Sequence, residues 1–149
     1  MPAKRTVAAV VSMVLIPGGW RAPGDACSLL TQAEVSSVVG IMLSAHPTAP
    51  TACVWTEPPS PTFANRRVEV TVIKPEGFDI GKTPVGKMTK TPVSGIGDDA
   101  YYAEGFGMVT LSVKKGAAAV VINVKSRSWS TDQSKAMEKD LAQKALARL

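Results

Sequence analysis

The sequence predicts an α+β fold, in which an antiparallel β-sheet carries an N-terminal and a C-terminal helix packed on one face. Two capping boxes, Thr31-Gln32-Ala33-Glu34 and Ser130-Thr131-Asp132-Gln133, indicate helix starts near the two ends of the domain. Between them, several segments alternate apolar and polar residues, as strands with one buried face do. Elements with a single apolar side pack most economically in two layers. With 149 residues, 45% of them hydrophobic, the chain is long enough for one such domain.

Residues 1–26 have the pattern of an export signal. The segment begins with a basic Lys-Arg pair, continues with an apolar run over residues 6–16, and ends in helix breakers and small residues. The apolar run is only about half as long as a bilayer-spanning helix. Cleavage after Ala26 or after Gly24 satisfies the preference for small residues at the cleavage site. We therefore expect residues 27–149 to form a single domain that is secreted, periplasmic or held in the cell envelope.

Cys27 follows the signal directly, and two incompatible roles are open to it. A lipobox would make it the lipidated residue of an anchored lipoprotein, but Gly24-Asp25-Ala26 fits that motif only at its last position. A disulfide with Cys53 is the alternative, because an oxidising compartment permits it. Such a bridge would close a loop of about 25 residues and stabilise the fold by roughly 3 kcal/mol. We favour the disulfide, and expect membrane attachment only if Cys27 is lipidated.

The first half of the domain combines one helix with two strands. The helix runs from its cap at Thr31 to Gly40, which suits a left-handed helix end. A short strand over residues 52–56 lies within a segment rich in proline and threonine. A second strand over residues 67–74 alternates valines with polar residues. Residues 75–92 are the least predictable part of the chain, and we expect a short helix or an edge segment there.

The second half begins with a Gly-rich turn that leads into a strand near Tyr101. Strands over residues 108–115 and 117–127 follow, joined by a hairpin turn at Gly116. The last helix follows its capping box and has an apolar stripe, with polar and charged residues on its other side. The residues of that stripe are Met137, Leu141, Ala142, Ala145, Leu146 and Leu149.

The residue types present argue against most catalytic and metal sites. The one histidine, His46, lies in a proline-flanked segment, and two cysteines with one histidine are too few ligands for structural zinc. The adjacent carboxylates Asp98 and Asp99 lack the further oxygen ligands of a calcium loop. No phosphate-binding glycine motif is present, so no nucleotide cofactor is expected. We predict no catalytic residue, no metal and no cofactor. The alternative is a secreted hydrolase that uses scattered carboxylates: Glu57, Glu69, Glu76 and Glu104.

The basic residues suggest a binding face. The chain has 17 Lys and Arg against 12 Asp and Glu, and many of the basic residues lie at strand ends. If consecutive strands pair, the sheet face away from the helices gathers a set of polar and basic residues that suits an anionic envelope polymer or a protein partner. Nucleic acid is not expected, because the aromatic residues are not interleaved with the basic ones. The candidate face comprises Arg67, Thr71, Thr110, Ser112, Lys114, Asn123, Lys125 and Arg127.

Three motifs occur in an order that resembles a family of small exported bacterial proteins, many of them lipoproteins, described only as a domain of unknown function. The motifs are Cys27-Ser28-Leu29-Leu30-Thr31, Cys53-Val54-Trp55 and Gly95-Ile96-Gly97-Asp98-Asp99-Ala100-Tyr101. The resemblance covers nearly all of residues 27–149. It implies an envelope setting and a disulfide between the two cysteines, and it carries no catalytic residues with it. The sequence thus favours a non-enzymatic binding or accessory protein with an unknown envelope ligand or protein partner.

Overall fold

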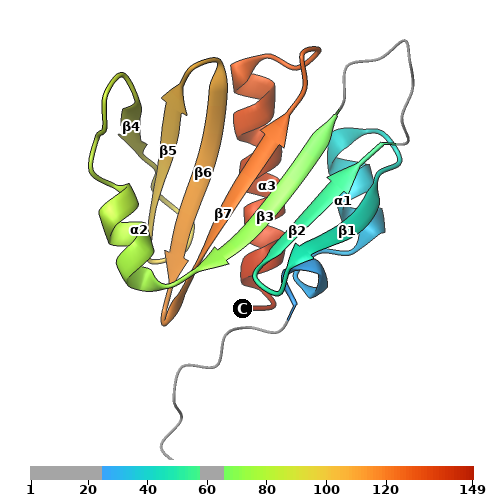
Figure 1. Ribbon diagram of the computed structural model, residues 1–149, viewed down its shortest axis with the longest axis horizontal. Helices are drawn as coiled ribbons and strands as arrows, with labels where there is room; N and C mark the ends of the chain where they lie inside the picture. Colours follow the sequence, from blue (N-terminus) through green and yellow to red (C-terminus); the bar gives the residue numbers. More distant parts are fainter. Residues whose placement is uncertain (1–24, 58–65) are drawn as a thin grey trace, which may run out of the picture.

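The computed structural model describes residues 25–57 and 66–149, so all of the predicted signal peptide except Asp25 and Ala26 lies outside the described residues. Seven strands form one antiparallel sheet in the spatial order β1-β2-β3-β7-β6-β5-β4 (Figure 1). In chain order the described elements are the 3-10 turn η1 (Ala26–Ser28), α1 (Gln32–Val39), β1 (Ser44–Ala49), β2 (Ala52–Thr56), β3 (Arg67–Ile73), α2 (Pro75–Gly81), β4 (Thr89–Pro92), β5 (Asp99–Gly105), β6 (Met108–Lys115), β7 (Ala118–Lys125) and α3 (Thr131–Leu146).

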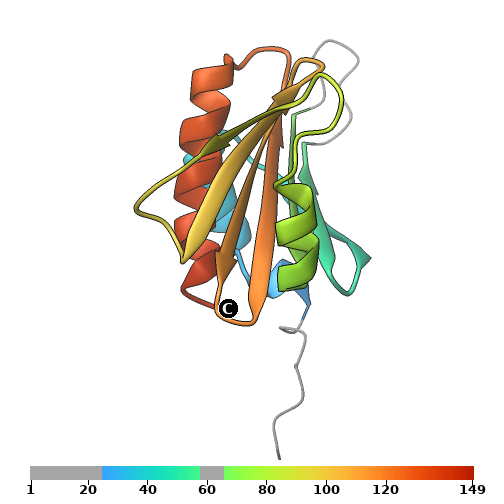
Figure 2. The same cartoon turned by 90° about the vertical axis from the view of Figure 1, so that its left-hand side faces the viewer.

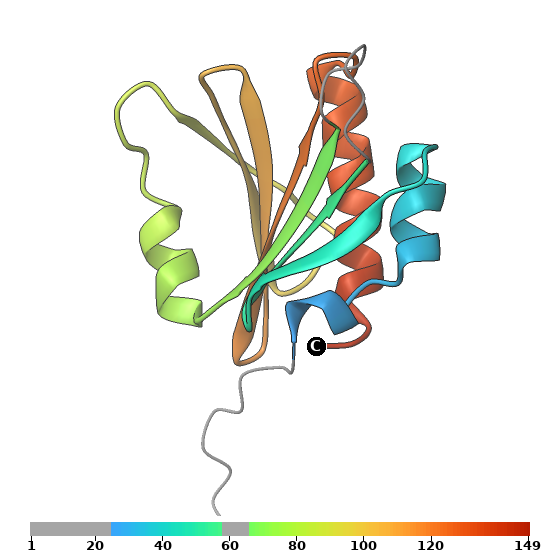
Figure 3. The same ribbon diagram turned by 45° about the vertical axis from the view of Figure 1, so that its right-hand side comes forward.

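The predicted mixed class, the antiparallel sheet and the C-terminal helix are confirmed. α3 lies along one face of the sheet over β6 and β7, and α1 packs beside α3 (Figures 1 and 3). Alternate residues of the central strands point toward these helices, which explains the period of two in the sequence. The largest buried cluster includes Val68, Val70 and Val72 of β3 with Leu111 and Val113 of β6.

α2 corrects the expected two-layer arrangement. It lies across the sheet from α3, so one end of the sheet is covered on both faces (Figure 2). Phe78 of α2 is fully buried, with its ring centroid 5.0 Å from that of Tyr101. A second apolar cluster, completed by Ala103 and Ala119, forms beneath the helix. The segment that is least predictable from sequence therefore contains both a short helix and the edge strand β4.

The sequence does not predict β1, which forms the other edge of the sheet. This strand pairs antiparallel with β2, and its register shifts between Pro47 and Ala49. A proline is tolerated there because one side of an edge strand needs no ladder hydrogen bonds. All six residues of β1 are exposed, including His46, which lies opposite Val54 in the register.

The disulfide between Cys27 and Cys53 is confirmed, and it ties η1 to β2 with a Cα–Cα distance of 5.0 Å. Ala26, one residue before it, is fully buried, and its backbone N–H donates to the Pro50 carbonyl at 3.0 Å. The Asp25 carboxylate accepts from the Cys27 backbone N–H at 3.0 Å. Because its sulfur is bonded to Cys53, Cys27 has no free thiol for lipid attachment in this structure.

Candidate functional site

The sheet opens between β6 and β7 at the end near the start of α3. Their register runs from Lys115–Ala118 to Leu111–Ile122 and stops there, although both strands continue. Side chains bridge the opening, because buried backbone groups need partners. The Asn123 side-chain amide donates to the Val109 carbonyl at 2.7 Å and to the Thr110 hydroxyl at 3.2 Å.

An open groove of about 650 Å³ lies beside this opening on the sheet face away from α1 and α3. A smaller hollow of about 50 Å³ extends from the opening toward Ser134 in the second turn of α3, and it shares Met108, Asn123 and Lys125 with the groove. The two hollows therefore meet where the strands separate. The groove is lined by Thr56, Glu57, Arg67, Glu69, Met108, Asn123 and Lys125.

The charges that line the groove balance. The Arg67 guanidinium forms an ion pair with the Glu69 carboxylate at 2.7 Å. Glu57 accepts a hydrogen bond from the backbone N–H of Arg66 at 3.2 Å, while Lys125 is exposed. Two cationic and two anionic side chains thus face one groove. A polyanion gains little from a surface whose positive charge is already neutralised, whereas a neutral or zwitterionic ligand matches it.

The structure brings together only part of the predicted binding face. Arg67, Asn123 and Lys125 line the groove, and Thr71 and Thr110 lie on the same side of the sheet. α2 accounts for two of the departures, because it covers the far end of that face. The first departure is Ser112, which is only 4% exposed, and the second is Lys114, which forms an ion pair with Asp79 of α2 at 2.8 Å. Arg127 is exposed in the loop after β7 rather than in the strand.

Glu138 is a buried carboxyl group in α3, although the sequence pattern predicts polar and charged residues on the side of that helix away from its apolar stripe. It is fully buried, and its Oε1 accepts a hydrogen bond from the backbone N–H of Val124 at 3.0 Å. Its Oε2 has no hydrogen-bond partner among the described residues. Burial raises the pKa of Glu138 to about 8, against the smaller opposing effects of the Val124 N–H and the Lys135 ammonium.

Spacing along the helix is the signal that could have located Glu138. Ser134 and Glu138 precede Leu141, Ala142 and Ala145 at intervals of three and four, so all five lie on one side of α3 and are buried. A polar residue within a buried stripe indicates that a hydrogen-bonding partner lies on the element it packs against. Here that position is β7 beside the strand opening, where Val124 receives the Glu138 hydrogen bond.

Trp55 holds the other unpartnered buried side-chain atom of the described chain, its indole Nε1. It lies opposite Val68 in the register, and Val68 lies opposite Val124. Val124 donates its backbone N–H to Glu138, so both unpartnered groups are linked to this one row of the sheet. Among the described residues, they are the buried side-chain atoms that retain unused hydrogen-bonding capacity.

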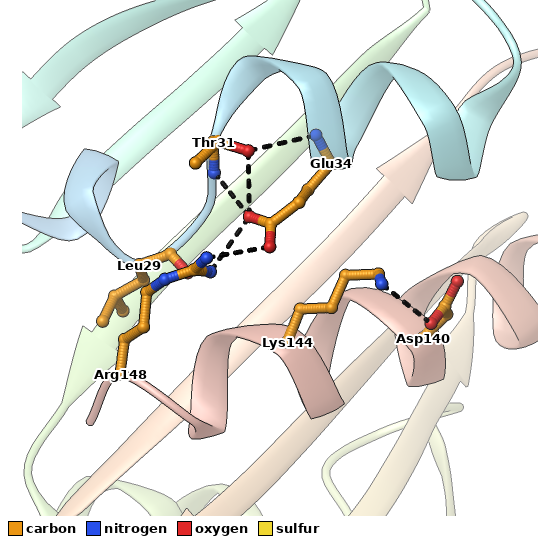
Figure 4. Close-up of polar contacts among 6 residues, drawn as sticks. All are labelled: Leu29, Thr31, Glu34, Asp140, Lys144 and Arg148. Atoms are coloured by element: carbon orange, nitrogen blue, oxygen red, sulfur yellow. Dashed lines mark hydrogen bonds and ion pairs between the residues drawn. The ribbon is translucent and has the colours of Figure 1, made fainter.

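A clamp between α1 and the end of the chain uses a second carboxylate, Glu34 (Figure 4). The Arg148 guanidinium donates to both Glu34 oxygens at 2.8 and 2.9 Å and to the Leu29 carbonyl at 2.9 Å. Glu34 also accepts from the Thr31 backbone N–H at 2.8 Å, completing the capping box. These contacts, led by the Arg148 hydrogen bonds, lower the pKa of Glu34 to about 2. Both carboxylate oxygens already serve this clamp, so we assign Glu34 a structural role.

Asp98 and Asp99 serve turn and pairing roles. The Asp98 carboxylate accepts from the Gly116 backbone N–H at 2.7 Å, which ties two turns together. Asp99 forms an ion pair with Lys82, and the hydrogen bond from this ammonium lowers the pKa of the Asp99 carboxyl.

Within residues 25–57 and 66–149, no cluster of three or more His, Cys, Asp or Glu has the arrangement needed to hold a metal ion. None of the described helices has the length and apolar character needed to span a membrane.

Comparison of the chain with known protein families, curated proteins and solved structures found no match. The resemblance to exported proteins of unknown function therefore stays a prediction, and the site must be interpreted from its own geometry.

Proposed function

We propose that the chain is exported to the cell envelope and acts there as a non-enzymatic binding domain. Its binding site is the groove over β2, β3, β6 and β7. The observation that carries this proposal is the convergence of Arg67, Asn123 and Lys125 on that one groove. The Cys27–Cys53 disulfide supports export, because such bridges persist in oxidising compartments.

The balanced charge of the groove favours a ligand that carries both an amine and a carboxylate, as short peptides do. Lys125 is placed to receive a ligand carboxylate, while Glu57 and Glu69 are placed to receive an amine. The Asn123 amide and the Thr56 hydroxyl add neutral hydrogen-bonding groups along the lining. A short segment of a partner protein or a free envelope peptide would provide this chemistry.

An NMR titration tests the proposal, using protein purified from an exporting bacterial host. We expect the tripeptide alanyl-glutamyl-lysine to shift the side-chain amide signals of Asn123, and oligogalacturonate, a polyanion, to leave them in place. Lys125→Met should weaken tripeptide binding about tenfold, the approximate value of one charge-assisted hydrogen bond. Lys87→Met makes the same change at an exposed lysine outside the groove and should leave binding unchanged.

Two results would count against this assignment. Saturable binding of oligogalacturonate without tripeptide binding would favour the anionic polymer that the sequence suggested as a ligand. Titrations in which neither probe shifts the Asn123 signals would remove the groove as the binding site.

The hydrolase alternative has two of its four carboxylates in the groove, Glu57 and Glu69. Glu69 is held by the Arg67 guanidinium and Glu57 by the Arg66 backbone N–H, which fixes both carboxylates as acceptors and suits a binding role. Glu104 lies elsewhere and forms an ion pair with Lys135 at 2.6 Å. The groove carboxylates are thus separated from Glu104, and we favour binding over hydrolysis.

A further inference from the structure

The hairpin between β5 and β6 ends in an exposed aromatic residue held in an unfavourable backbone conformation. Gly105 pairs with Met108, so Phe106 and Gly107 form a two-residue turn, with φ values of 54° and 72°. Two positive φ values are those of a type I′ turn, which favours Asn-Gly. A bulky side chain at positive φ is a steric outlier. Phe106 is nevertheless 77% exposed and Met108 45% exposed, so packing within the chain does not offset this cost.

Basic side chains flank this hairpin tip. The small hollow beside it is lined by Gly107 and Met108 together with Lys125 and Ser126, so the tip adjoins the loop between β7 and α3. Lys125 and Arg127 are both exposed there. The nearby carboxylate of Glu104 is not a free negative charge, because it is paired with Lys135.

The loop between α2 and β4 brings a second apolar and basic pair to the same end of the molecule (Figures 1 and 3). Its proximity to the hairpin is direct, because a Cβ added at Gly105 would lie 3.1 Å from the Met88 Cγ. Val85 in this loop is 70% exposed, and Lys87 is exposed as well. We call the set Val85, Lys87, Phe106, Met108, Lys125 and Arg127 the basic-apolar rim.

We propose that the basic-apolar rim docks onto the surface of an anionic phospholipid bilayer. Val85 and Phe106 project from loops and line neither hollow, and the exposed Met108 begins β6 directly after the turn, so this apolar tip suits insertion among lipid headgroups. Its three charges are all positive, and an anionic leaflet attracts lysine and arginine near its surface. The rim adjoins the groove, with which it shares Met108 and Lys125, and it does not involve Cys27.

Vesicle co-sedimentation tests the proposal with protein purified from an exporting bacterial host. We expect binding to vesicles of equal parts phosphatidylglycerol and phosphatidylcholine, weakening as salt is raised, and little binding to phosphatidylcholine alone. Phe106→Asn should weaken binding about tenfold by removing the apolar tip. The same change should hold or raise the melting temperature, because asparagine tolerates the left-handed conformation. The melting temperature and the vesicle binding of this one variant therefore report separately on folding and on membrane binding.

Ile80→Gln is the matched control, because Ile80 is 76% exposed on α2 and lies outside the rim. Its vesicle binding should equal that of the unmodified protein. Replacing both Lys125 and Arg127 with glutamine should reduce binding and flatten its salt dependence. The proposal is overturned if the protein does not bind the anionic vesicles, if it binds both vesicle types equally, or if Phe106→Asn binds as tightly as the unmodified protein.

Discussion

Replacement of Glu138 by glutamine should remove a large pH dependence from the stability of this protein. The Glu138 carboxyl has a pKa of about 8 in the folded chain against an ordinary value of 4.5, because the fold buries it beside a single N–H donor. Between these two values the unfolded chain has released this proton and the folded chain retains it. Stability therefore falls as pH rises through that window, and is unaffected by this group below it.

The magnitude follows from the distance between the two pKa values. Each pH unit in the window corresponds to about 1.4 kcal/mol at 25 °C, so the full penalty above pH 8 is on the order of 5 kcal/mol. Between about pH 5 and pH 8 the free energy of unfolding should fall by roughly 3–4 kcal/mol, because the slope is less than full at both ends of the window. Glutamine keeps the acceptor for the Val124 N–H but carries no titrating proton, so the variant should lack this component of the slope.

Urea unfolding, followed by the fluorescence of Trp55 and Trp129, provides the assay at several pH values across the window. Comparing the two proteins at each pH isolates Glu138, because every other titrating group is common to both. The clamp residue Glu34 should not interfere, because its pKa is lowered and its contribution changes only in acid. Parallel pH curves for the unmodified protein and Glu138→Gln would falsify the premise that the buried carboxyl retains its proton.

Three further predictions concern the clamp, the N-terminus and the core. Arg148→Met should lower the free energy of unfolding near neutral pH, because it removes the charge-assisted hydrogen bonds to Glu34. Because the pKa of Glu34 is lowered to about 2, the stability that this ion pair contributes is complete above pH 4.5 and is lost as pH falls through 2. The free energies of unfolding of Arg148→Met and the unmodified protein should therefore become equal in strong acid. A difference that stays constant with pH would contradict the pairing. Because Ala26 is buried in the fold, the intact mass of protein from an exporting bacterium should show cleavage after Gly24 rather than after Ala26. Reduction of the disulfide should add two hydrogens. A diacyl adduct on Cys27 would contradict both the cleavage site and the disulfide. Leu111→Asp should abolish the unfolding transition, because it places an unpaired charge in the core at a cost of roughly 4 kcal/mol or more; a folded variant would refute the assigned core.

Part of the candidate site could be predicted from sequence, because side chains alternate between the two faces of a strand. Arg67 begins β3, and Asn123 and Lys125 end β7, each at a position whose side chain faces away from the helices. The period of two along a strand is sufficient to assign these residues to one face. The same period also places Ser112 and Lys114 there, but it carries no information on what covers them. Ser112 and Lys114 are absent from the binding face because α2 packs against β6 and β7, which are distant from it in the sequence.

The sequence by itself determined the local features of this protein. Capping boxes placed the starts of α1 and α3, alternating valines identified β3, and Gly116 marked the β6–β7 hairpin, because each depends on interactions between residues close along the chain. Only the tertiary structure decided the opening of the sheet, the burial of Glu138 and the clamp that joins Arg148 to Glu34 across 114 residues. These features depend on where elements distant in sequence pack against one another. Local periodicity cannot specify that packing, because it records which side of an element is apolar and not which neighbour covers it.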